Sequence, residues 1–302
     1  MNALRLAQAQ VMEYVHEAKW QGHLPGGMAV FGGGGVQAPG VLTWAAMKLY
    51  ERTHDAEFLD AVYAACAQNN RWWYAQKQYD ADGNGLLEWA ALTSGWDNSP
   101  RWDTGPVESV DLNSWLCLDQ QVLAHMATEL GRPAAERDGW WRKANRTAAL
   151  MQRRLWDEKE GVFFDYNGKL NRSIAVVTPV TYFALLPGVA TQAQAVRMAA
   201  QLRNTSSLAT PYPLPVVAAS NPAYQPFLYW RGPWVPTNLL SKRKQAGLTR
   251  LCRVGTGLGS TSTSCPSSVW SATVCTPRRT SCGGRRWRWW RARTCCASTT
   301  TA

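Results

Sequence analysis

The chain has 302 residues and a formal net charge of +11, but this charge is unevenly distributed. Residues 1–240 carry 20 Lys and Arg against 21 Asp and Glu, whereas residues 241–302 carry the other 12 basic residues and no acidic residue. The near-neutral body argues against nucleic acid as a partner, and no apolar run reaches membrane-spanning length. With no charged-then-apolar leader in the sequence, we expect a soluble, cytoplasmic protein.

The first 77 residues predict helices interrupted by a glycine-rich loop. Apolar side chains recur at helical spacing in residues 3–18. Residues 21–40 contain four consecutive glycines and predict a loop, either beside a pocket or acting as a linker. The helical spacing returns in residues 41–53 and 56–77, which predict two helices joined at a turn where Asp55 can cap the second.

The next stretch, YDADGNGLLE, resembles the beginning of a calcium-binding EF-hand loop. It has oxygen-bearing groups at alternate positions and a glycine at the sixth. Position twelve is Ala91, which offers no ligand and argues against a complete EF-hand. Two interpretations stay open, a turn without a metal and a loop that surrounds a hard cation. In the second, the ligands would be Asp80, Asp82, Asn84, the carbonyl group of Leu86, and Glu88.

Residues 94–103, SGWDNSPRWD, cannot form a regular helix because Pro100 lacks an amide proton and restricts the residue before it. They predict a structured loop that presents Asp97 between Trp96 and Arg101. A carboxyl beside an indole is partly desolvated, which raises its pKa and keeps a proton available for general-acid work. Arg101 could hold substrate hydroxyls or a second carboxylate. The alternative is a loop whose aromatic rings fill a core and whose Asp caps the next turn.

Further helices are predicted by apolar spacing at residues 109–130, 134–156, 178–186 and 192–202. Between the second and third of them, the segment VFFDY predicts a short strand. A proline-rich extended segment then leads to YWRGPWVPTN at residues 229–238, where an indole could stack on a sugar ring and an arginine could bind hydroxyls.

The two motifs resemble those of a known group of enzymes. SGWDNSPRWD is similar to the catalytic-acid loop of inverting α-glycosidases in the trehalase and processing α-glucosidase I clan, which includes mannosylglycerate hydrolase-like proteins. YWRGPWVPTN resembles the YWRGP-type motif of the same clan. Two departures stand out: Thr93 occupies a position where many members have Glu, and one apolar residue fewer separates Pro233 from Trp234.

The resemblance covers about residues 1–240 and implies an all-α (α/α)6 toroid of the six-hairpin type, here incomplete. It implies hydrolysis of an α-linked glucosyl or mannosyl unit with inversion, on an oligosaccharide or small glycoside, with Asp97 as general acid. No cofactor is required, although some members bind calcium at a loop like the one described above. The residues that it places at the sugar are Trp96, Arg101, Trp102, Asp111, Asn113, Tyr229, Trp230 and Arg231.

Residues 241–302 do not share the resemblance. They contain six of the eight cysteines and are rich in Trp, Arg, Ser and Thr. We interpret this abrupt change as a tail that is translated out of frame or disordered. The less favoured alternative is that RRWRWWRAR, within this tail, makes the chain a basic interaction protein that binds nucleic acid or a membrane surface.

The tail also affects the expected chemistry, because the clan supplies its catalytic base from the C-terminal helices. An inverting glycosidase needs a second carboxylate to activate water. The last acidic residue of this sequence is Asp165, so no position can receive that role. We therefore expect weak or no turnover from the chain as written, and a sugar-binding protein without catalysis is the alternative function.

Overall fold

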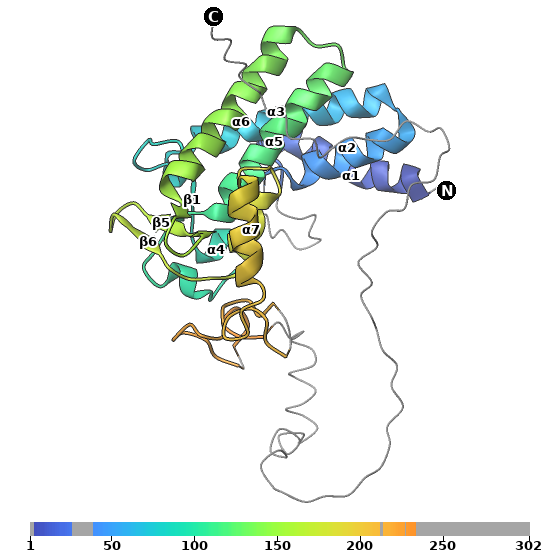
Figure 1. The fold of residues 1–302 in the computed structure, drawn as a ribbon. Helices are drawn as coiled ribbons and strands as arrows, with labels where there is room; N and C mark the ends of the chain where they lie inside the picture. Colours follow the sequence, from blue (N-terminus) through green and yellow to red (C-terminus); the bar gives the residue numbers. More distant parts are fainter. Residues whose placement is uncertain (1–2, 26–38, 212–213, 227, 234–302) are drawn as a thin grey trace, which may run out of the picture. The chain divides into compact units, whose positions relative to one another are not determined.

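The computed structural model describes residues 3–25, 39–211, 214–226 and 228–233. The predicted glycine run and the tail from residue 241 lie outside these residues. Six helices of ten residues or more form most of the described fold (Figure 1): α1 Ala3–Gln21, α2 Val41–Thr53, α3 Ala56–Ala75, α5 Val110–Glu129, α6 Ala134–Arg154 and α7 Gln192–Gln201. A single short helix, α4, spans Ala91–Ser94.

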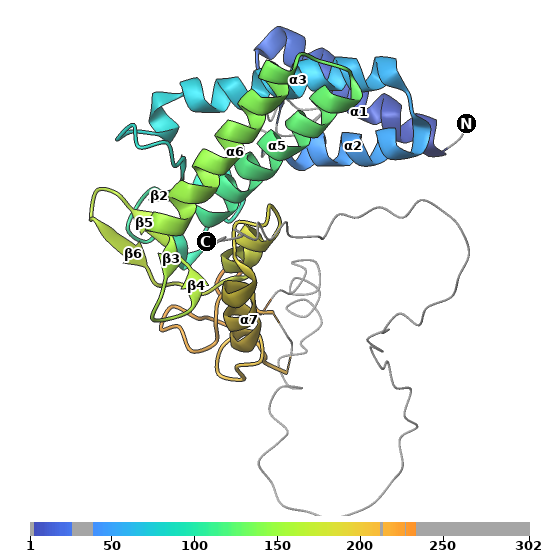
Figure 2. The same cartoon turned by 45° about the horizontal axis from the view of Figure 1, so that its top comes forward.

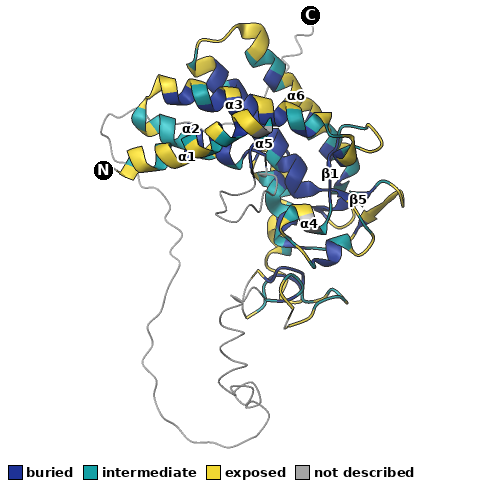
Figure 3. Ribbon diagram, turned by 180° about the vertical axis from the view of Figure 1, so that it is seen from behind, coloured by how far each residue is buried: buried dark blue, intermediate teal, exposed yellow. Residues whose placement is uncertain are grey.

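Helix α5 is the central element, and it packs against α2, α3 and α6. Its buried positions fall on all sides of the helix, as expected of an interior helix; Figure 3 shows buried positions, in dark blue, on the side that faces the viewer. Helix α6 is more polar and buries one stripe, formed by Trp140, Ala144, Thr147 and Met151. Their spacing of three or four residues places these side chains on a single face of α6. Helix α6 therefore packs against α5 through this face only.

The sequence located most helices correctly. The boundary between α2 and α3 forms as predicted, because the Asp55 side chain accepts a hydrogen bond from the backbone nitrogen of Phe58 at 3.0 Å. The predicted helix at residues 178–186 is instead the 3₁₀ helix η3, Pro179–Leu185. Its start is fixed by Thr178, whose side chain accepts a hydrogen bond from Val180.

Short strands lie beside the N-terminal end of α5. A four-stranded antiparallel sheet has the order β1-β2-β5-β6. Its strands are β1 Glu88–Trp89, β2 Val107–Glu108, β5 Asp165–Asn167 and β6 Arg172–Ile174, and a separate hairpin pairs β3 Trp156–Asp157 with β4 Val162–Phe163. Figure 2 shows the strands and α7 toward one end of the α5–α6 pair, with α1–α3 toward the other. The sheet therefore brings together segments that are far apart in the sequence. It lies next to the loop at residues 94–103.

No helix in the described part of the chain is long and apolar enough to cross a membrane.

Candidate functional site

The loop at residues 94–103 has the irregular structure that its sequence predicts. Helix α4 ends at Gly95, which has a positive φ of 74° that a glycine adopts without strain. A turn follows, closed by a hydrogen bond from the backbone nitrogen of Ser99 to the Trp96 carbonyl oxygen at 2.9 Å. The 3₁₀ helix η2, Pro100–Trp102, then begins with its proline in the first position, where no amide proton is needed.

Asp97 lies within this turn and is exposed to solvent. The sequence predicted a carboxyl desolvated by the neighbouring indole, and in this respect the structure differs. The Trp96 ring contacts the ring of Trp230, with the two centroids 4.5 Å apart. Asp97 is therefore presented to solvent by a turn whose indole is anchored elsewhere.

The two sequence motifs meet at Asn98. Its side-chain oxygen accepts a hydrogen bond from the backbone nitrogen of Trp230 at 3.0 Å, and its carbonyl oxygen accepts one from Nε of Arg231 at 2.7 Å. Arg231 also forms an ion pair with Asp103. We call the residues that join the two motifs the motif cluster: Trp96, Asn98, Asp103, Trp230 and Arg231.

Within the motif cluster, Arg231 uses its nitrogens for the protein itself, since Nε binds Asn98 and both terminal nitrogens bind Asp103. The Trp230 ring lies between Trp96 and Tyr229, with both centroids at 4.5 Å. Trp230 Nε1 is buried without a hydrogen-bond partner among the described residues. The arginine thus positions the loop, while the indole retains an unused donor.

Arg101 is fully buried and binds carboxylates, which is the second of the two roles that its sequence position suggested. Its Nε donates to Asp165 Oδ2 at 2.6 Å, and its Nη2 donates to Asp111 Oδ1 at 2.8 Å and to the Ser109 hydroxyl at 3.0 Å. Burial lowers the pKa of Arg101, but the charges of Asp111 and Asp165 outweigh this effect and raise the pKa overall. Arg101 and Asp111 therefore belong to a buried ion cluster that holds the loop against α5 and β5.

Asn113 and Trp102 also make contacts within the protein. Asn113 is buried, and its side chain accepts a hydrogen bond from the Leu87 nitrogen at 2.8 Å and donates to the Leu87 carbonyl at 2.9 Å. Trp102 donates from Nε1 to the Trp96 carbonyl at 2.8 Å, and its ring centroid lies 4.5 Å from the guanidinium carbon of Arg101. Asn113 therefore fixes the segment before β1, and Trp102 covers the ion cluster.

The loop predicted to resemble an EF-hand is a turn held by its own side chains. Asn84 Oδ1 accepts a hydrogen bond from the Leu86 nitrogen at 2.8 Å. Its Nδ2 donates to Asp82 Oδ2 at 2.7 Å and to Glu108 Oε1 at 2.9 Å. Asn84 thus directs its amide nitrogen toward these two carboxylates, whereas a metal ligand would direct its amide oxygen toward the ion. Among the described residues, no group of three or more His, Cys, Asp or Glu is arranged to hold a metal ion.

Glu108 also contacts this loop, and no motif in the sequence predicts this contact. It pairs with Glu88 across the β1–β2 ladder, and Arg154 Nε binds its carboxylate at 2.7 Å. Burial, followed by the charges of Asp82 and Glu108, raises the pKa of Glu88. Only the strand pairing brings Glu108 to the loop, and neither two-residue strand has a recognisable alternating pattern.

Residues 26–243 match the model of a protein family described as the mannosylglycerate hydrolase MGH1-like glycoside hydrolase domain. The match covers most of the chain, including both motifs. It confirms the resemblance that the two motifs indicated.

Solved structures are similar to this one as well. The GH63 mannosylglycerate hydrolase from Thermus thermophilus in complex with glucose is 22% identical, with a TM-score of 0.59, over 76% of this chain and 72% of that one. An uncharacterized conserved protein from Thermus thermophilus is 22% identical, with a TM-score of 0.58, over 70% and 66%. Neutral trehalase from Saccharomyces cerevisiae is 17% identical, with a TM-score of 0.60, over 74% and 54%.

The chain thus spans about two thirds of the length of the uncharacterized Thermus protein and about half that of the trehalase. The described residues are predominantly helical, and their fold is similar to that of these structures. Both observations confirm the predicted all-α fold. The described residues form part of an (α/α)6 fold of the six-hairpin type, and the chain belongs to the MGH1-like glycoside hydrolase family.

Proposed function

We propose that this glycoside hydrolase-like protein hydrolyses an α-linked glucosyl or mannosyl unit with inversion, and that Asp97 is the general acid. The observation that carries the proposal is the position of Asp97, which is exposed on a turn. The residues on either side of it, Trp96 and Asn98, are held by contacts with the second motif. A general acid must reach the leaving oxygen in a defined orientation, and a rigid turn supplies that orientation before the substrate binds.

The surroundings of Asp97 suit a sugar. Tyr229 is 44% exposed and contacts Trp230, with the two rings tilted by 47°, so it offers an aromatic ring close to the residue that binds the acid-bearing turn. Sugar rings bind to aromatic faces, and Tyr229 presents such a face. The mannosylglycerate hydrolase of Thermus has been solved with glucose, and also with Tris and D-glycerate. Small sugars and glycosides are therefore the substrate class that we propose.

The proposed reaction also requires a catalytic base. Inversion needs a second carboxylate about 6.5–9.5 Å from the acid, with room for a water molecule. Four carboxylates around the loop have other partners: Asp103 binds Arg231, Asp111 and Asp165 bind Arg101, and Glu108 binds Arg154. Because these carboxylates are already paired with arginines, they favour a second candidate function, a sugar-binding protein without turnover.

The proposed chemistry uses carboxylates alone and requires no cofactor. Calcium would be structural, held at the acidic loop by Asp80, Asp82, Asn84, the Leu86 carbonyl and Glu88. Hard oxygen donors of this kind suit calcium, provided that the Asn84 amide turns its oxygen toward the ion.

Two measurements on the same preparation separate the candidate functions. Hydrolysis of an aryl α-glucoside and an aryl α-mannoside is followed by release of the phenol, and the first anomer released is identified by NMR. Binding of free glucose and mannose is measured by calorimetry. Turnover that first releases the β-anomer supports the hydrolase, whereas saturable binding without turnover supports the sugar-binding protein. Absence of both would contradict both candidates.

A further inference from the structure

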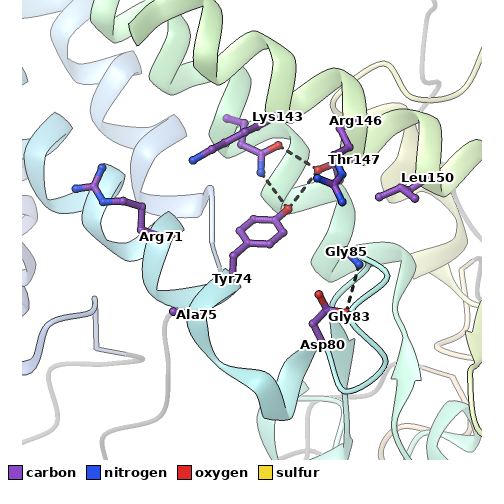
Figure 4. A pocket seen from close by; sticks show the side chains of 11 residues that line it. Arg71, Tyr74, Ala75, Asp80, Gly83, Gly85, Lys143, Arg146, Thr147 and Leu150 are labelled. Atoms are coloured by element: carbon purple, nitrogen blue, oxygen red, sulfur yellow. Dashed lines mark hydrogen bonds between the residues drawn. The ribbon is translucent and has the colours of Figure 1, made fainter.

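A cavity of about 410 Å³ lies away from the motif cluster, between α3, α6 and the acidic loop (Figure 4). Arg71 and Tyr74 line it from α3, Lys143 and Arg146 from α6, and Asp80 from the loop. Its size is within the range of pockets that hold small metabolites. Three cationic side chains and one carboxylate therefore share a space large enough for a ligand.

The floor of this cavity is a closed set of hydrogen bonds (Figure 4). Gln120 Nε2 donates to the Tyr74 oxygen at 3.0 Å, the Tyr74 and Thr147 hydroxyls lie 3.2 Å apart, and Thr147 donates to Gln120 Oε1 at 3.2 Å. Gln120 and Thr147 are buried, and burial raises the pKa of Tyr74 to about 12. The floor is therefore neutral and rigid, and it offers no charge to balance the cations above it.

The three cationic side chains of the cavity are exposed to solvent, and Lys143 Nζ lies 4.4 Å from the centroid of the Trp140 ring. Arg71, Lys143 and Arg146 form no ion pair with any carboxylate in the described ranges. Burial lowers the pKa of Lys143, and the positive charge of Arg71 lowers it further. Like charges held together in this way repel one another, and a bound anion would relieve the repulsion.

We propose that this cavity binds a small oxyanion, the phosphate or carboxylate group of a sugar-sized metabolite. The guanidinium groups of Arg71 and Arg146 suit such a group because their planar donors match its oxygens. Asp80 accepts a hydrogen bond from the Gly85 nitrogen at 3.3 Å and would repel an anion close to it. Arg146 lies beside Gly85, the residue whose nitrogen binds Asp80, so the cations do not form one side opposite this carboxylate. The anion belongs where the cations reach it away from Asp80, and hydroxyls of the same ligand belong near Asp80.

The proposal is independent of hydrolysis, because the cavity and the motif cluster share no residue. The probe is inorganic phosphate, titrated into the full chain at low ionic strength and followed by calorimetry and by the melting temperature. We expect saturable binding and a rise in melting temperature. Replacing Arg146 by Ala, or Lys143 by Gln, should raise the Kd about tenfold or more, because hydrogen bonds to charged groups are lost.

Arg142→Ala is the matched control, since Arg142 is exposed on the same helix but does not line the cavity. It removes the same charge and should leave the Kd unchanged. Titration with malonate in place of phosphate separates the two sources of the oxyanion, and either one binding more tightly supports the proposal. Sodium chloride that reproduces the stabilisation at equal ionic strength would overturn it, as would equal weakening in Arg142→Ala and Arg146→Ala.

Discussion

Arg231 donates a hydrogen bond from Nε to the carbonyl oxygen of Asn98 at 2.7 Å, across 133 residues of sequence. This bond connects the loop that carries Asp97 to the second sequence motif. Because the donor is a charged guanidinium and the site is partly buried, the interaction is stronger than a neutral hydrogen bond. The acid-bearing turn therefore depends on Arg231 for its position.

We predict that Arg231→Met lowers the free energy of unfolding by about 1–3 kcal/mol, the range for a lost charge-assisted hydrogen bond. Urea denaturation measures this change. If the protein hydrolyses glycosides, the same variant should lower kcat/KM, because the orientation of Asp97 is lost. Arg203→Met is the control, since Arg203 is exposed. Equal effects of the two substitutions would show that Arg231 does not position the loop.

The ion cluster around Arg101 leads to a larger predicted loss of stability. Arg101→Met removes the partner of two carboxylates, Asp111 and Asp165, whose side chains are at most 5% exposed. Leaving a buried charge unpaired costs about 3–5 kcal/mol. The midpoint of urea unfolding should fall accordingly. A loss of less than about 1 kcal/mol would indicate that water reaches the carboxylates and that the cluster does not hold the loop.

From the burial of Asp119 we predict that the stability of the fold depends on pH. It is buried in α5 and accepts hydrogen bonds from Thr43 and from Asn70 Nδ2, the latter at 2.8 Å. Burial raises its pKa from 3.8 to about 6, with the two hydrogen bonds opposing the effect. The folded protein therefore binds the proton more tightly than the unfolded chain does. This contribution is complete below about pH 4 and is lost as the pH rises through about 6.

The expected change is on the order of 2–3 kcal/mol between pH 4 and pH 7, from a pKa difference of about two units. Asp119→Asn provides the comparison, because it keeps the shape of the side chain and removes the titration. The unfolding free energy of the wild type minus that of the variant should fall as the pH rises. A difference that stays constant over this interval would contradict the assignment to Asp119.

Calcium provides a test of the acidic loop. If Asp80, Asp82, Asn84 and Glu88 bind the ion, saturating calcium should raise the melting temperature, and Asp82→Ala should remove the rise. Stabilisation follows because the ion binds the folded loop only. Glu13→Gln, an exposed carboxylate on α1, is the control. No shift with calcium, or the same shift in Asp82→Ala, would show that the loop is a turn without a metal.

The sequence predicted the helices well, because apolar side chains at helical spacing must be buried on one face. The boundary at Asp55 followed from its capping side chain, and the irregular loop followed from Pro100. The site was harder to predict. Arg101 and Asp111 have polar side chains in and beside a loop, as ligand-binding residues do, and only the fold shows that they are buried. Asp165, which completes their cluster, is 64 residues away from Arg101.

The contribution of Asp97 to catalysis is the central claim, and comparing two leaving groups tests it most directly. Protonation by a general acid matters most when the leaving group is poor, and it accounts for about 10²–10⁴-fold in rate. Asp97→Asn should therefore lose about that factor in kcat/KM on an alkyl α-glycoside and far less on a nitrophenyl α-glycoside. Asp138→Asn, an exposed carboxylate on α6, should change neither. Equal losses on the two substrates would contradict the assignment of Asp97 as general acid.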